Sequence, residues 1–419
     1  MKLLFLSPFA APTKNYYRSI HQGLGILAAM AVREGHQAEI RAFSDLNELE
    51  PVLSCDYDYA LLTTFSNQLG LVRETLGFLG KRGVKTVLGG VHATFAPEDF
   101  LDLPFEYLVR GEGEGFFQEF LKTPGNLSGY KGVITGGRKP VPDFAPLCLD
   151  LDSNPFPMRY LEPPDKARNI IGFEVLSTRG CHYDCTYCSA PAYAGAYHGY
   201  YRRRSVGNVV AEILEAGLKY PLIGFHDDHF LADERWLQEF LEIYPSRVGK
   251  PFWCNSRVEA INTGIVDKMK RAGLIRVHLG IEAGSFETRK NLLNRNLTDE
   301  QIISAFQILK KAGIMTVGFS ILGLPDETED SLWKLVELNR RAAPDRAHYS
   351  LFQPYPGTYL AGYCRDRKIR VEFSESYYRW EKIPDLPGIS SERLKYFLDN
   401  FISLIYLKPG KIAGGKGKK

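Results

Sequence analysis

The stretch RGCHYDCTYCSAP places Cys181, Cys185 and Cys188 at spacings of four and three residues, with Tyr187 directly before the last cysteine. Thiolates this close together can bind a metal, form a redox pair or simply pack. A closed zinc site needs four ligands, usually from two CxxC pairs, and a fully ligated iron–sulfur cluster needs four thiolates. Three cysteines on one loop can hold three irons of a [4Fe–4S] cluster and leave the fourth iron open for a substrate or cofactor.

The remaining cysteines do not complete this set, because they are scattered and follow no ligand spacing: Cys55, Cys148, Cys254 and Cys364. Each is interpreted as a small buried hydrophobe, although Cys254 lies near the end of an expected strand and could approach the site. A thioredoxin-like interpretation of CTYC leaves Cys181 unexplained. Seven cysteines, three of them in one cluster, favour a reducing cytoplasm with a metal or redox site over a disulfide framework.

Alternating strands and helices must position the cysteine loop. From Phe173 onward six segments have strand character, and each but the last is followed by a helical pattern: FEVLSTRG, IGFHDDHF, PFWCNSRV, RVHLGIEAG, MTVGFSILGLP and AHYSLFQPYPGT. This series predicts a partial (β/α)6 barrel over residues 169–368, and one of its helices begins with Thr298 and Gln301 as a capping box. Chemistry in such barrels sits at the carboxyl ends of the strands, where the unusual residues lie: Cys181, Asp227, Asp228, Arg257, Glu282, Gly323 and Tyr355.

A similar alternation precedes the barrel, in residues 1–135. It predicts a parallel sheet with helices on both faces, the doubly wound Rossmann-like arrangement. Residues 136–168, rich in Pro, Gly and Asp, are expected to form a linker. Residues 369–419 contain one helical pattern, SERLKYFLDNFISLIYL, and a basic, glycine-rich tail that we expect to be disordered.

Composition excludes several classes of partner. The 419 residues carry 52 basic and 49 acidic side chains, a net charge of +3, so no global field draws the protein to nucleic acid or anionic lipid. We find no apolar run long enough to span a membrane. The opening MKLLFLSPFAAP is better explained as a buried first strand than as a secretory signal, and the cytoplasm is the expected location.

The cysteine motif and the strand ends together resemble the radical S-adenosylmethionine (radical SAM) superfamily over about residues 171–360. The resemblance implies that Cys181, Cys185 and Cys188 ligate a [4Fe–4S] cluster, that SAM binds its open iron, and that reductive cleavage of SAM yields a 5′-deoxyadenosyl radical. It also implies contacts with SAM: Tyr187 and Gly323 beside the adenine, Asp227 or Asp228 near the methionine part, and Arg257 and Glu282 at the carboxylate and ribose. A buried ion pair is the alternative for any one of the charged residues.

The first domain resembles the cobalamin-binding domain of one large radical SAM branch, through GLGILAAMAVREGH, LLTTFSN, GGVHATFAPEDFL and YLVRGEGEGFFQEFL. The resemblance implies a cobalamin site on the loops after its strands, formed by Thr63, Thr64, Gly89, Gly90, His92, Gly111 and Glu112. No DxHxxG motif is present, so a histidine from that loop is not expected to reach the cobalt, and a structural hydrogen-bonding role is the alternative for His92. A degenerate domain that has lost cobalamin but kept the fold is a further alternative.

The leading hypothesis is a cobalamin-dependent radical SAM methyltransferase acting on an unactivated carbon of a small or medium-sized metabolite. The alternative is a radical SAM dehydratase, cyclase or rearrangement enzyme, for example on a sugar or antibiotic precursor, with His226, His229 or Tyr355 as proton donor or acceptor. A sensing module that binds corrin or cluster is a third possibility. The expected partners are a small-molecule substrate and an external one-electron reductant of the flavodoxin or ferredoxin type, without nucleic acid.

Overall fold

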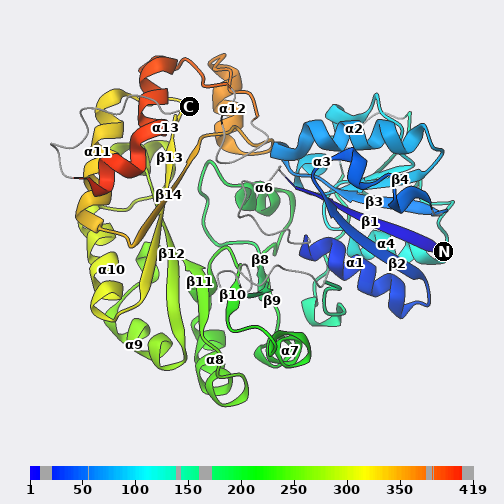
Figure 1. Cartoon of the computed structure of the whole chain (residues 1–419), viewed down its shortest axis with the longest axis horizontal. Coiled ribbons are helices and arrows are strands. Elements are labelled where there is room, and N and C mark those ends of the chain that lie inside the picture. Colours follow the sequence, from blue (N-terminus) through cyan, green and yellow to red (C-terminus); the bar gives the residue numbers. More distant parts are fainter. Residues whose placement is uncertain are drawn as a thin grey trace.

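The computed structural model describes residues 1–9, 21–54, 56–137, 143–159, 172–373, 380 and 382–407. The chain forms two α/β units, each built on a sheet of six strands. Figure 1 shows the first unit, in blue and cyan, beside the second, in green to red. The predicted fold class, a doubly wound domain followed by a partial barrel, is confirmed.

The first sheet has the order β2-β1-β3-β4-β5-β6. Its strands are β1 (Lys2–Pro8), β2 (Gln37–Phe43), β3 (Tyr59–Thr63), β4 (Lys85–Gly89), β5 (Tyr107–Val109) and β6 (Val133–Thr135). Helices connect most of them: α1 (Gln22–Arg33), α2 (Leu69–Gly80), the short α3 (Val91–Phe95) and α4 (Glu114–Lys122). β1 is apolar along nearly its whole length because it is buried on both faces: Leu3 and Phe5 belong to one core, and Leu4 and Leu6 to the other.

One strand departs from the expected parallel sheet. β6 pairs with β5 in the antiparallel direction, whereas the other neighbours in this sheet are parallel. At three residues β6 is too short to show a periodic pattern, so its direction could not be predicted. The backbone enters it through Gly132, at a φ of +78°, where a β-carbon would lie 2.1 Å from the Ala145 nitrogen. The chain beyond β6 therefore passes directly over the sheet edge.

The second sheet has the order β14-β13-β12-β11-β10-β7, and all of its pairings are parallel. The six strands coincide with the predicted segments: β7 (Phe173–Val175), β10 (Ile223–Phe225), β11 (Phe252–Ser256), β12 (Leu274–Glu282), β13 (Met315–Leu322) and β14 (Arg346–Leu351). The helices between them are α6 (Ser189–Ala196), α7 (Val206–Glu212), α8 (Glu234–Arg247), α9 (Thr263–Arg271), α10 (Asp299–Lys311) and α11 (Glu329–Ala342). The capping box of Thr298 and Gln301 is present at the start of α10.

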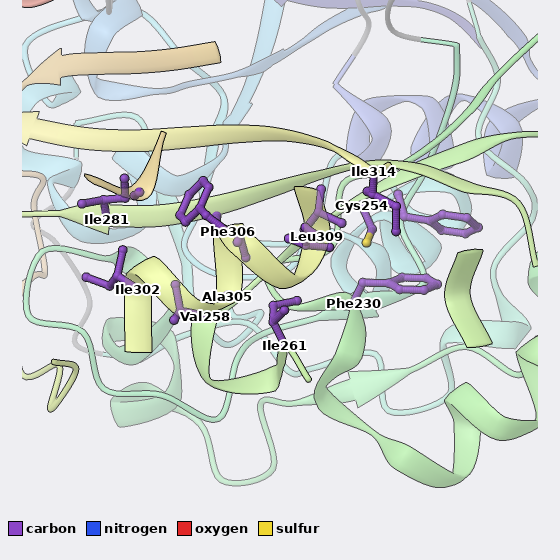
Figure 2. Packing of buried hydrophobic residues seen from close by; sticks show 14 of the residues in the cluster. Phe230, Cys254, Val258, Ile261, Ile281, Ile302, Ala305, Phe306, Leu309 and Ile314 are labelled. Atoms are coloured by element: carbon purple, nitrogen blue, oxygen red, sulfur yellow. The ribbon is translucent and has the colours of Figure 1, made fainter. Parts of the chain in front are cut away.

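The strands of the barrel have two different faces. Cys254, Val277 and Ile281 point toward the helices, where they join the main apolar core with Phe306 and Leu309 of α10. Figure 2 shows this packing, with the sulfur of Cys254 among hydrocarbon side chains. Cys254 therefore does not approach the cysteine loop, because strand alternation turns its side chain to the helical side.

Elements beyond the barrel complete the second unit. α12 (Tyr359–Asp366) follows β14, where no helix was predicted, and α13 (Ser391–Tyr406) forms within the predicted helical stretch. The ring centroids of Phe401 in α13 and Tyr349 in β14 lie 5.1 Å apart, so this helix covers the last strand. The basic tail, Cys55 and part of the linker lie outside the described residues. None of the helices in the described ranges combines the length and apolar character that crossing a membrane requires.

Candidate functional site

A cavity of about 700 Å³ lies between the two units. The first unit lines it with loops that follow β1, β3, β4 and β5, including Thr63, Gly89, Gly90, Gly111 and Glu112. The second unit contributes Cys188, Asp228 and Tyr355. Ligand sites form outside the carboxyl ends of strands in both architectures. Here those two ends meet in a single chamber.

The two adjacent aspartates after β10 have different tasks. The fully buried carboxylate of Asp227 accepts hydrogen bonds from the Ser177 and Thr178 nitrogens, at 2.7 and 2.5 Å, and from their hydroxyl oxygens, at 2.9 and 2.6 Å. Asp227 thus holds the turn from β7 to β8 (Thr178–Arg179), directly before the cysteine loop. Asp228 lines the cavity instead, and burial raises the pKa of its carboxyl to about 6. Of the two candidates, the geometry leaves Asp228 available to a ligand.

The three cysteines of the loop lie near one another at the barrel mouth. The Cys185 thiol is buried, and Arg257 Nη1 lies 3.2 Å from its sulfur. Burial raises the pKa of Cys181, and it raises that of Cys188 to about 12. Within the described ranges, no three Cys, His, Asp or Glu side chains gather closely enough to hold a single metal ion.

The donor chemistry nevertheless fits a cluster. An iron–sulfur cluster takes thiolates around several metal atoms instead of one. The guanidinium of Arg257, which also lies 3.6 Å from the ring of Tyr183, supplies a positive charge beside the sulfur of Cys185. Such a cation favours the thiolate form that a metal ligand needs.

Tyr187 and Glu282 form a buried polar group behind the cysteines. The Tyr187 hydroxyl donates to Glu282 Oε1 over 3.1 Å, and Arg295 Nη1 donates to the same oxygen over 3.1 Å. Arg257 Nη2 pairs with Glu259 Oε1 at 2.6 Å. Glu282 has a φ of +65°, an uncommon backbone conformation for a residue other than glycine. Arg257 and Glu282, which were predicted to contact SAM, therefore both take part in ion pairs, and their role toward SAM stays a prediction.

Nine of the sixteen predicted site residues do not line the cavity: Thr64, His92, Cys181, Cys185, Tyr187, Asp227, Arg257, Glu282 and Gly323. His92 is buried with both ring nitrogens engaged, at 2.8 Å from Ser66 Oγ and 2.8 Å from Asp99 Oδ2. Thr64 Oγ1 accepts from the Ala93 nitrogen at 3.0 Å. Gly323, at a φ of +77°, packs against Leu351 and Leu394, which leave little room for a β-carbon. These contacts give His92, Thr64 and Gly323 structural tasks.

Charged residues that the sequence analysis missed join the two units. Arg179 Nη1 lies 3.1 Å from Glu112 Oε1, and the Arg179 guanidinium also pairs with Glu114. Arg202 binds both Glu112 oxygens, at 2.6 and 2.8 Å, and its Nη1 donates to the Cys148 carbonyl at 2.6 Å. Burial opposes ionisation of Glu112, but Arg202 and Arg179 lower its pKa. Two features of the sequence could have indicated these ion pairs. One is an arginine beside the cysteine motif, and the other is the pair of acidic residues in RGEGEG, which would repel a bound anion.

His21 was also missed, because it follows no motif. It lines the cavity at the start of α1, and its Nδ1 is buried without a hydrogen-bond partner among the described residues. Burial, followed by the charge of Arg179, lowers the pKa of His21 to about 4. A buried polar atom without a partner is typical of a site that a ligand completes.

Comparison with known proteins agrees with this geometry. The sequence pattern of the radical SAM superfamily matches residues 175–338. Residues 175–338 therefore form a radical SAM domain. Such a domain implies an enzyme with a [4Fe–4S] cluster and SAM, a small-molecule substrate and a source of electrons.

Individual relatives extend over both units. An uncharacterized methyltransferase of Pyrococcus horikoshii is 28% identical, over 98% of this chain and 93% of its own length. The anaerobic magnesium-protoporphyrin IX monomethyl ester cyclase of Rubrivivax gelatinosus is 30% identical over 70% of this chain, but only 55% of its own length is matched. The structure of TsrM, a radical SAM methyltransferase from Kitasatospora setae with cobalamin and a [4Fe–4S] cluster bound, superposes with a TM-score of 0.69 at 17% identity. That superposition covers 88% of this chain and 75% of TsrM, and it shows a shared fold.

Proposed function

We propose that the protein is a cobalamin-dependent radical SAM methyltransferase that acts on an unactivated carbon of a small or medium-sized metabolite. The observation that carries the proposal is one shared cavity. The loops after β1, β3, β4 and β5 of the first unit, which we call the crevice, line it together with Cys188 of the cysteine loop. A radical methylation of this kind requires that SAM and cobalamin both reach the same substrate, in a space closed to water. The methyltransferase from Pyrococcus horikoshii and the cobalamin-bound TsrM support the same function.

Each cofactor has a matching set of residues in the proposal. Cys181, Cys185 and Cys188 would hold the cluster, and Asp228 would meet the amino group of SAM. Together the cluster and SAM supply the 5′-deoxyadenosyl radical. Thr63, Gly89, Gly90, Gly111 and the unpartnered His21 would border cobalamin, which supplies the transferable methyl group.

The residues of the chain position these groups and exclude water. Asp227 holds the turn before the cysteine loop through four hydrogen bonds. Gly90 lets the backbone approach that of Thr64, where a β-carbon would lie 2.5 Å from the Thr64 nitrogen. Tyr193 and Tyr200, whose parallel rings lie 5.0 Å apart, form part of the cavity wall between the two units. Such preorganised walls place reacting groups without any acid or base.

A second candidate function is a radical dehydration, cyclisation or rearrangement, and one contact favours it. His226 Nε2 lies 2.7 Å from Glu174 Oε1, and both residues line the cavity. A histidine paired with a carboxylate is a common proton donor and acceptor. His229 suits the task less, because burial lowers the pKa of His229 to about 4.

One experiment separates the two functions. The protein is reconstituted anaerobically with iron and sulfide, incubated with hydroxocobalamin and desalted, and its iron and cobalt contents are measured. Near-stoichiometric cobalt, and a product heavier than its substrate by one methylene, support methyl transfer. A loaded cluster without cobalt, and a product that has lost water or kept its mass, would overturn it.

The remaining partners follow from the proposed chemistry. A flavodoxin or ferredoxin in the cytoplasm would supply the single electrons that reductive cleavage of SAM requires, and a cluster of cysteines that bind a metal site is typical of a reducing compartment. The near balance of 52 basic and 49 acidic residues does not favour a nucleic-acid substrate.

A further inference from the structure

Arg179 occupies an unusual position between the two halves of the cavity. In the sequence it lies two residues before Cys181, on the short strand β8. Its side chain points away from its own barrel toward the first unit, where it pairs with Glu112 and Glu114. The residue that leads into the cysteine loop is therefore held by the unit proposed to bind cobalamin.

The two carboxylates belong to the wall of the crevice. Glu112 and Glu114 lie between the end of β5 and the start of α4, and both line the cavity. Their side chains are only 9% and 6% exposed, so water screens their charges weakly. Arg202 and the Cys148 nitrogen, which donates to Glu112 Oε2 over 3.0 Å, fix Glu112 further. A ligand in the crevice would therefore act directly on the two carboxylates that pair with Arg179.

Charges near a redox centre act on it, and Arg179 lies two residues before Cys181, the first proposed cluster ligand. The reduction potential of an iron–sulfur cluster depends on the charges, hydrogen bonds and solvent around it. A cation near the cluster favours the reduced state, whereas a carboxylate favours the oxidised state. Arg179 and the two carboxylates therefore shift the reduction potential of the cluster in opposite directions. The carboxylates partly cancel the effect of the cation.

We propose that Arg179, held by Glu112 and Glu114, is a positioning residue that couples occupancy of the crevice to the reduction potential of the cluster. Filling the crevice removes the remaining water that reaches the two carboxylates from the cavity, and so strengthens their hold on Arg179. The reduction potential of the cluster then differs between the protein with bound cobalamin and the protein without it. The coupling rests on the proposed function, because it requires cobalamin in the crevice, whereas the charge effect of Arg179 on the cluster does not.

The test is a redox titration of the reconstituted full-length protein, with the cluster followed by electron paramagnetic resonance. Arg179→Gln should lower the ratio of reduced to oxidised cluster at one fixed potential by about tenfold, and Glu114→Gln should raise it by a similar factor. Arg179→Lys keeps the charge and should restore most of the ratio. Arg82→Gln, which breaks an exposed pair with Glu50, is the matched control and should leave the ratio unchanged.

Shifts of opposite sign identify an electrostatic role, since loss of structure alone would move both variants in the same direction. Hydroxocobalamin should then shift the ratio in the wild type and not in Arg179→Gln. Equal or absent shifts in variants with full iron content would overturn the proposal. If cobalamin binds and the wild-type ratio stays constant, the coupling is wrong and the proposed function survives. If cobalamin does not bind at all, both the proposed function and the coupling fail.

Discussion

The two walls of the cavity differ in the residues that form them. The barrel wall presents reactive side chains: Cys188, Asp228 and Tyr355. The crevice wall combines apolar side chains with glycines that expose the backbone, among them Gly89, Gly90 and Gly111. One wall is defined by the chemistry it offers and the other by the space it leaves. Substitutions should therefore remove a function on the barrel side and remove room on the crevice side.

The largest effect is expected at a cysteine of the loop. Cys185→Ala should abolish the visible absorption of the cluster and the cleavage of SAM, because a three-thiolate site cannot spare a ligand. Cys254→Ala is the control: its thiol lies in the apolar core, so the variant should lose some stability and keep the cluster. Iron content, absorption and 5′-deoxyadenosine formation measure both variants. An active Cys185→Ala protein would refute the assignment of the loop.

The crevice should respond most to an added β-carbon. Gly90 has a φ of +100°, and a β-carbon there would lie 2.5 Å from the Thr64 nitrogen. Gly90→Ala should cost about 3 kcal/mol in the free energy of unfolding and should remove cobalamin retention while the cluster still assembles. Gly77→Ala in α2 meets nothing within 4 Å, so it should be neutral or stabilising. Denaturant unfolding and cobalt content report the difference, and equal behaviour of the two variants would contradict the crevice geometry.

A smaller effect should appear in the pH dependence of stability. His21 has a pKa of about 4 in the folded protein, below its ordinary 6.5. The unfolded chain therefore binds more protons, and the stability present above pH 6.5 is lost as the pH falls toward 4. The free energy of unfolding of the apoprotein should fall by about 2 kcal/mol from pH 7 to pH 5 through this residue. His21→Phe should flatten that part of the curve, and an unchanged slope would show that His21 is not buried as a neutral ring.

The smallest expected effect separates the neighbouring aspartates. Asp228→Asn should leave the cluster intact and weaken SAM binding by about tenfold, the loss of one interaction with a charged group. Asp227→Asn cannot accept all four of its hydrogen bonds, so it should loosen the cysteine loop and lower iron content. Calorimetric titration of SAM and iron analysis compare the two. The assignment is reversed if Asp227→Asn keeps its iron and loses SAM.

Much of the barrel wall was predictable from sequence. All six barrel strands overlap the predicted segments, because each carries a local apolar pattern bounded by turn residues. The cysteine spacing is likewise local. The crevice wall was less predictable: three glycines, Thr63 and Glu112 of the predicted set line it, while Thr64 and His92 lie elsewhere and His21 was missed.

The sequence by itself determined the two α/β units, the order of their strands along the chain and the loop that carries the cysteines. These features depend on neighbouring residues, whose periodicity survives in any context. The tertiary structure alone decided that β6 runs antiparallel, that Asp227 holds a turn while Asp228 faces the cavity, and that Arg179 joins the crevice to the cysteine loop. Each of these depends on a partner distant in the chain, so even adjacent residues of the same type can receive different tasks.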